Sequence, residues 1–77
     1  MTSADTTVYS EYTTADGTLV RVEGTYSFSH RPFARLEIYL PYTRLWVDYP
    51  SLEEGRRVAE ELIGMTEEEL CRWHRDL

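Results

Sequence analysis

Val, Thr and Tyr alternate with polar residues in two neighbouring stretches of the chain, Val8 to Thr14 and Thr18 to Phe28. Residues of these types favour strands, and the Ala15-Asp16-Gly17 segment between the stretches has the composition of a tight turn. The pattern therefore predicts a β-hairpin. Gly24 interrupts the second strand and indicates a bulge or a close approach of another part of the backbone.

The apolar positions choose between two registers for this hairpin. A two-residue Asp-Gly loop would place Glu11 opposite Val22 on the apolar face. A three-residue loop with Gly17 in the left-handed conformation instead pairs Thr14 with Thr18, and it keeps the charged residues out of the core. We predict the second register, in which one face carries Val8, Tyr12, Val20, Val22, Tyr26 and Phe28 and the other carries Glu11, Arg21 and Glu23.

A second hairpin is predicted after the connection Ser29 to Pro32, which carries His30 and Arg31. Apolar residues occupy every second position from Ala34 to Leu40, and Thr43 to Tyr49 forms a fourth strand after a short turn at Pro41-Tyr42. One long bent strand without that turn is the alternative. If Leu40 pairs with Thr43, three favourable cross-strand pairs form on the outward face: Tyr39 with Arg44, Glu37 with Trp46, and Arg35 with Asp48.

Two helix-start signals follow Pro50, namely Ser51-Leu-Glu-Glu54 and Thr66-Glu-Glu-Glu69. In each, the hydroxyl residue is the expected N-cap and the glutamate three positions later closes a capping box. Gly64 is placed to stop the first helix. The chain therefore ends in two helices.

The apolar residues of these helices recur at helical spacing. Gly55 lies within the first stripe and indicates close approach to another backbone, and Met65 and Leu70 occupy the positions of a hydrophobic staple. We expect the first helix to turn Leu52, Val58, Ala59, Leu62 and Ile63 towards the sheet, and the second to present Leu70, Trp73 and Leu77.

The predicted fold class is α+β: an antiparallel sheet of three to four strands in two hairpins, followed by two C-terminal helices packed on one face. The 77 residues are expected to form one small domain, with residues 1–7 frayed, 8–49 as the sheet and 51–77 as the helical flank. No apolar run is long enough to span a membrane, and nothing resembles a signal peptide. The single cysteine favours a reducing, cytoplasmic setting.

The residues offer little chemistry for catalysis. Cys71 and His74 lie three apart on the last helix, but a metal site needs three or four ligands and the only other histidine is His30. The four glycines are scattered, so no phosphate-binding loop is present. We expect no enzyme activity, cofactor or metal, and we interpret Cys71 and His74 as a buried or half-buried thiol and a surface histidine.

Charge is distributed unevenly along the chain. The formal net charge of −6 argues against direct binding to nucleic acid. Residues 51–77 hold eight acids and four arginines (−4), and residues 1–50 hold six acids and four arginines (−2). Much of this acidity has a local explanation as a solvated helix face. Arg56 and Arg57 lie four residues before Glu60 and Glu61, and Glu53 lies four before Arg57, so the first helix is expected to be partly self-compensated. The candidate residues for docking to a basic partner surface are Glu60, Glu61, Glu67, Glu68 and Glu69.

The outward face of the sheet is the other candidate for binding. If the registers hold, it presents Tyr9, Arg21, Arg35, Tyr39, Arg44 and Trp46. Aromatic residues and arginine are enriched at binding hot spots, so Tyr39, Arg44 and Trp46 are expected to pack against a partner. Alternatively, the last helix wraps round and buries part of this face.

In size, charge and architecture the whole chain resembles the small acidic proteins with which phages inhibit host defences, of which the anti-CRISPR proteins are the best known. The resemblance involves no shared motif. It implies a non-catalytic protein-binding module in the host cytoplasm that docks on a basic, nucleic-acid-binding surface of a host defence complex. The alternative function is that of a small structural or regulatory subunit that forms a homodimer through its aromatic sheet face.

Overall fold

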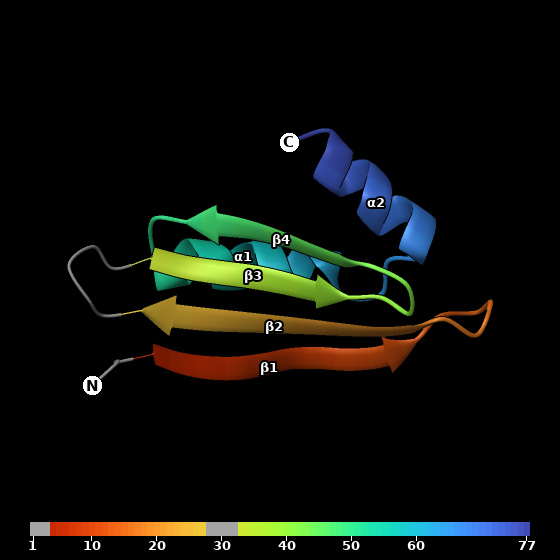
Figure 1. Cartoon of the computed structure of the whole chain (residues 1–77), viewed down its shortest axis with the longest axis horizontal. Coiled ribbons are helices and arrows are strands. Elements are labelled where there is room, and N and C mark those ends of the chain that lie inside the picture. Colours follow the sequence, from red (N-terminus) through yellow and green to blue (C-terminus); the bar gives the residue numbers. More distant parts are fainter. Residues whose placement is uncertain (1–3, 28–32) are drawn as a thin grey trace.

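The computed structural model describes residues 4–27 and 33–77, which form four strands followed by two helices. The strands are β1 (Ala4–Thr13), β2 (Leu19–Ser27), β3 (Phe33–Tyr39) and β4 (Arg44–Tyr49), and the helices are α1 (Leu52–Leu62) and α2 (Glu67–Arg75). The strands lie in the order β1-β2-β3-β4, each antiparallel to its neighbour, and α1 crosses the sheet on one side (Figure 1). The predicted α+β fold is confirmed. Phe28 and the connection 29–32 lie outside the described residues.

The first hairpin has the predicted three-residue loop. The Thr14 N–H donates to the Thr18 carbonyl at 2.9 Å, and Tyr12 lies opposite Val20. Gly17 has a φ of +88°, in the left-handed region that glycine adopts without strain. The register therefore follows the reasoning that kept Glu11 off the apolar face.

The second hairpin also has the predicted register. The Leu40 N–H donates to the Thr43 carbonyl at 2.9 Å, which closes a two-residue turn at Pro41-Tyr42. The cross-strand pairs are those expected: Tyr39 with Arg44, Glu37 with Trp46, and Arg35 with Asp48. The alternative of one long bent strand is wrong.

A bulge in β1 corrects the prediction for the start of the sheet. The register shifts between Val8 and Ser10, so Val8 lies opposite Glu23 on the outward face and is 47% exposed. Tyr9 was expected to face outward, but it packs against the core on the helix side, where its ring occupies the space over Gly24. The residues from Ala4 to Thr7 are paired with β2 instead of frayed, and residues 1–3 of the segment predicted to be frayed lie outside the described residues.

The core lies between the sheet and the helices. Gly55 brings α1 close to the sheet, since a Cβ atom at this position would lie 3.2 Å from the Ala34 Cβ. Tyr12 joins β1 to the end of α1, because its hydroxyl donates to the carbonyls of Leu62 (3.2 Å) and Met65 (2.8 Å). The buried apolar cluster consists of Val20, Val22, Leu36, Ile38, Leu40, Ala59, Leu62 and Leu70.

The start and end of α1 follow the sequence signals, but its apolar stripe is narrower than expected. The Ser51 hydroxyl accepts from the Glu54 N–H at 3.2 Å, and Gly64 adopts a φ of +96° after the helix ends. This cap forms only its serine half, without a return bond from the Glu54 side chain. Leu52 and Ile63 were expected to face the sheet and are instead 46% and 42% exposed.

The second helix has a complete capping box. The Thr66 hydroxyl accepts from the Glu69 N–H at 3.2 Å, and the Glu69 carboxylate accepts from the Thr66 N–H at 2.9 Å. Met65 and Leu70 both pack into the core, as the hydrophobic staple predicts. Leu77 is 66% exposed, so its predicted place in the apolar stripe is wrong.

Candidate protein-binding surface

The face of the sheet opposite α1 is left uncovered by the described part of the chain. Helix α1 lies behind the sheet and α2 lies beyond β4, so neither crosses this outer face (Figure 1). The alternative in which the last helix buries part of the face is therefore wrong for the described residues. By register, the outer face carries Thr6, Val8, Glu11, Thr13, Leu19, Arg21, Glu23, Thr25, Arg35, Glu37, Tyr39, Arg44, Trp46 and Asp48.

Trp46 is the largest exposed apolar residue on the outer face, with 50% of its surface accessible. The guanidinium carbon of Arg35 lies 4.3 Å from the centroid of the Trp46 ring, within the range of a cation–π interaction. Arg35 also donates to both carboxylate oxygens of Asp48, at 2.7 Å from Nε and 3.1 Å from Nη2. These hydrogen bonds raise the pKa of the Arg35 guanidinium. The indole is thus held by an arginine whose own position is fixed.

Tyr39 and Arg44 form a second aromatic–arginine pair beside Trp46. The guanidinium carbon of Arg44 lies 5.6 Å from the Tyr39 ring centroid, and its Nε lies 3.5 Å from a carboxylate oxygen of Glu37. Glu37 in turn lies directly opposite Trp46. The structure therefore brings together Tyr39, Arg44 and Trp46, the three residues expected to pack against a partner.

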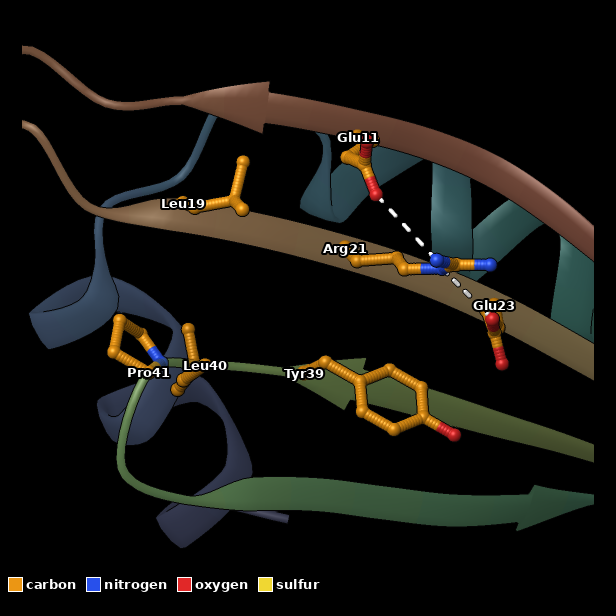
Figure 2. Close-up of a pocket in the computed structure, with 7 residues that line it drawn as sticks. All are labelled: Glu11, Leu19, Arg21, Glu23, Tyr39, Leu40 and Pro41. Carbon is orange, nitrogen blue, oxygen red and sulfur yellow. Dashed lines mark ion pairs between the residues drawn. The ribbon is translucent and has the colours of Figure 1, made fainter.

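A third arginine organises the other half of the outer face. Arg21 Nε lies 2.8 Å from Glu23, and its Nη1 lies 3.6 Å from Glu11 (Figure 2). Glu23 lies opposite Glu37 on the neighbouring strand, and the two carboxylates repel each other. The ion pairs of Glu23 with Arg21 and of Glu37 with Arg44 offset this repulsion. All three arginines on the face are bound to acids, which orders their side chains before any partner arrives.

A shallow groove of about 530 Å³ crosses this half of the face (Figure 2). Leu19 is 54% exposed and lies at one end of it, beside Pro41. The groove is lined by Glu11, Leu19, Arg21, Glu23, Tyr39, Leu40 and Pro41. It combines apolar surface with charges of both signs, which suits contact with a protein side chain.

The acidic candidates do not join this surface. Glu60 and Glu61 are exposed on α1, which lies on the other side of the sheet (Figure 1). No ion pair joins them to Arg56 or Arg57 within the described residues, so the expected pairs do not form, although these arginines still offset part of the charge of α1. The helical side therefore keeps its negative charge available to a partner.

The glutamates of α2 have local roles. Glu69 closes the capping box. The pKa of its carboxyl is lowered by hydrogen bonds from Thr66, with the largest contribution from the backbone N–H and a smaller one from the side chain. Glu68 pairs with Arg72 at 3.0 Å, one helical turn later. Glu67 begins the helix, where a negative charge is favoured by the helix dipole.

Cys71 and His74 make separate contacts in the structure. Cys71 is half-buried and packs against the core. His74 Nε2 donates to the backbone carbonyl of Trp46 at 3.3 Å, which joins α2 to β4. Among the described residues no group of three or more histidines, cysteines or carboxylates is placed to hold a metal ion. No helix in the ranges 4–27 and 33–77 has the length and apolar character needed to cross a membrane.

Comparisons with known proteins add no family to this description, because no family model, no curated protein and no solved structure matches the chain. The candidate surface therefore stands on its own geometry. Sequence reasoning missed two of its features, the exposed Val8 and the groove beside Leu19. The signal for the first was Gly24, whose missing side chain leaves room for the Tyr9 ring that the bulge turns inward.

Proposed function

We propose that the protein is a non-catalytic protein-binding module that contacts its partner through the outer face of the sheet. The observation that carries this proposal is the half-exposed Trp46, stacked on Arg35 and adjacent to the Tyr39–Arg44 pair on a face without helices. Exposed tryptophan costs solubility unless a partner covers it. Trp, Tyr and Arg are also the residues that supply most binding energy at protein interfaces.

The favoured partner carries a basic surface, such as the nucleic-acid-binding surface of a host defence complex. The outer face holds four acids and three arginines and is close to neutral, whereas residues 51–77 carry a net charge of −4. Charge on the helical side acts at a distance and attracts a basic partner without contacting it. The proposed module would act as an inhibitor by occupying that surface.

The test is affinity capture from a bacterial lysate with three baits: the original protein, Trp46→Ala and Ile63→Ala. Ile63 is an exposed apolar residue on the helical side, so its variant is a matched control. We expect one basic protein to be retained by the original and the control and to be depleted about tenfold or more on Trp46→Ala, a typical hot-spot effect. Equal retention on all three baits would contradict the proposal.

A second function is favoured by the charge pattern of the outer face. Strands β2, β3 and β4 each carry one arginine and one acid on this face, so a second copy turned by 180° could place arginine over acid. In this case the protein is a small structural or regulatory subunit that forms a homodimer. Sedimentation velocity would then show a dimer that Trp46→Ala converts to a monomer, and a monomer at high concentration would exclude this function.

A further inference from the structure

Strand β1 exposes one whole edge of the sheet. It is ten residues long, and no described segment lies along its outer side (Figure 1). The opposite edge, β4, is partly occupied, because His74 of α2 binds the Trp46 carbonyl. An open edge presents unpaired backbone N–H and C=O groups, which can pair with another extended chain.

The hydrogen-bond pattern shows which groups of β1 point outward. In antiparallel pairs, residues turn their N–H and C=O groups to one neighbour and then to the other, in alternation. The bond between Leu40 and Thr43 fixes this alternation, so Leu36, four residues before Leu40, bonds to β4. Its partner on β2, Gly24, therefore bonds to the other neighbour, at Thr7 of β1. The N–H and C=O groups of Thr6 therefore point away from β2, into solvent.

A groove of about 470 Å³ lies beside this edge on the helix side of the sheet. Its apolar surface comes from the half-buried Tyr9 and from Leu52, which is 46% exposed. Thr7 lines it from β1, and Glu53 and Arg56 line it from α1. A strand added to β1 would turn every second side chain towards this groove. In β-strand addition, a groove at this place gives specificity because it accepts alternate side chains of the added strand.

The groove itself is lined by one acid, Glu53, and one cation, Arg56, so the acid nearby on β1 decides the sign of the local charge. Asp5 is exposed on the same side of the sheet, and it makes no ion pair with any other described residue. The described strand β1 carries Asp5 and Glu11 and no cation, so two copies paired along β1 would bring four carboxylates to one seam. The bulge after Val8 also interrupts such a pairing. A basic extended segment of another protein avoids both problems.

We propose that the β1 edge binds an extended, basic segment of a partner protein by β-strand addition at Ala4–Val8. An apolar side chain of the segment enters the groove between Tyr9 and Leu52, and a lysine or arginine two positions away lies near Asp5 and Glu53. This site is distinct from the outer face that carries the proposed function, because its contacts are the backbone of β1 and the helix side of the sheet.

The test uses a short blocked peptide with valine and lysine two positions apart and a threonine between them, so that both side chains share one face, titrated into the ¹⁵N-labelled protein. We expect shifts of the amide signals of β1 and of Leu52, together with slower solvent exchange of the Thr6 amide. Thr6→Pro removes the outward N–H, which an edge strand tolerates, and should weaken binding about tenfold. The matched variant Thr6→Val changes the same side chain, keeps the N–H and should bind the peptide as the original does.

A second measurement keeps the test independent of how well Thr6→Pro folds. The same peptide can be methylated at the backbone nitrogens whose N–H groups would point towards β1. It then cannot donate these hydrogen bonds to β1 and should not bind the original protein. Equal binding of the methylated peptide, or of a peptide with glutamate in place of lysine, would overturn the proposal. Concentration-dependent shifts of the β1 amide signals without peptide would also overturn it, because they indicate that a second copy binds this edge. Trp46→Ala should leave the titration unchanged, so failure here is separable from failure of the outer face.

Discussion

Gly24 and Tyr9 form one packing unit on the helix side of the sheet. A Cβ atom at position 24 would lie 2.4 Å from Cε2 of Tyr9, which forces the half-buried ring to move. We expect Gly24→Ala to lower the free energy of unfolding by about 1–2 kcal/mol, in the range of other overpacked sites. In a Tyr9→Ala background the same change should be neutral or stabilising by about 0.5 kcal/mol, since alanine restricts the unfolded chain more than glycine.

Urea denaturation of the four variants in a double-mutant cycle measures this coupling. The loss from Gly24→Ala should disappear when the Tyr9 ring is absent. The same loss in both backgrounds would show that the backbone at position 24, and not the tyrosine ring, requires glycine.

Two tyrosines determine how stability responds to alkaline pH. Burial raises the pKa of Tyr12 above 10.0, and burial, followed by the charges of Glu54 and Glu61, raises the pKa of Tyr49. The folded state therefore holds these phenol protons more tightly than the unfolded state. The contribution of these protonated tyrosines to the free energy of unfolding is complete below pH 10. It is lost as the pH rises through their pKa values in the folded state.

We therefore expect the free energy of unfolding to fall above about pH 10, the ordinary pKa of tyrosine. Urea denaturation across this range should give a shallower fall for the double variant Tyr12→Phe, Tyr49→Phe. Tyr42 is 95% exposed, so Tyr42→Phe is the control and should keep the original slope. A double variant with an unchanged slope would show that other groups cause the alkaline loss.

At the residue scale, the sequence predicted the hairpin registers, and Gly24 indicated a bulge or a close approach, but nothing placed the bulge in β1 after Val8. Glu11 has only one acceptable face, and this single charge decided the first register. Val8 and Tyr9 fit either face, since both are strand-forming residues with apolar surface. An inserted residue leaves the composition of a strand unchanged, so only the coordinates revealed which of the two turns inward.

The two helix caps differ in strength at the element scale. Thr66 and Glu69 bond to each other in both directions, whereas Ser51 only accepts from the Glu54 N–H. We expect Thr66→Ala to cost about 1–2 kcal/mol and Ser51→Ala about 1 kcal/mol or less, following the usual range for N-caps. The first change should also loosen the packing of α2, which contacts the core through Leu70, Cys71 and Trp73.

Hydrogen exchange of the α2 amides is the measurement that separates these effects. Thr66→Ala should speed exchange from Leu70 to Arg75 more than it speeds exchange in α1, since opening is local to the weakened element. Ser51→Ala should leave α2 exchange unchanged. Uniform acceleration over both helices in Thr66→Ala would indicate that α2 opens only when the whole protein unfolds.

Element boundaries were predictable because they depend on local chemistry. Serine, threonine and glycine at Ser51, Gly64 and Thr66 act on the adjacent backbone, and the helices begin and end where these residues predict. The inward face of α1 was predicted less well. Leu52 and Ile63 fit its apolar stripe in sequence, but α1 packs most closely at Gly55, Ala59 and Leu62, and the ends of the stripe remain exposed.

For the whole molecule, the candidate site predicted from sequence divides into two surfaces. Cross-strand register predicted the grouping of Tyr39, Arg44 and Trp46. Glu60 and Glu61 were candidates for the same partner, yet they lie on the opposite side of the sheet from those residues. Sequence alone gives the charge of a helix but not its distance from an aromatic patch, because that depends on tertiary packing.

This separation predicts different kinetic roles for the two surfaces once the basic partner has been captured. Charge on the remote helical side should act on the rate of association, and contact residues should act on the rate of dissociation. We expect Glu60→Lys with Glu61→Lys to slow association about tenfold at low salt and to flatten its salt dependence, with dissociation unchanged. Trp46→Ala should speed dissociation and keep the salt dependence.

Surface plasmon resonance at several ionic strengths measures both rates for each variant. Ile63→Ala, an uncharged change at an exposed position away from the outer face, is a neutral control for both effects. Faster dissociation in the glutamate variant would show that α1 itself contacts the partner, and the helical side would then be part of the interface. Unchanged rates in that variant would remove the role of the acidic helices and leave the outer face as the only determinant of binding.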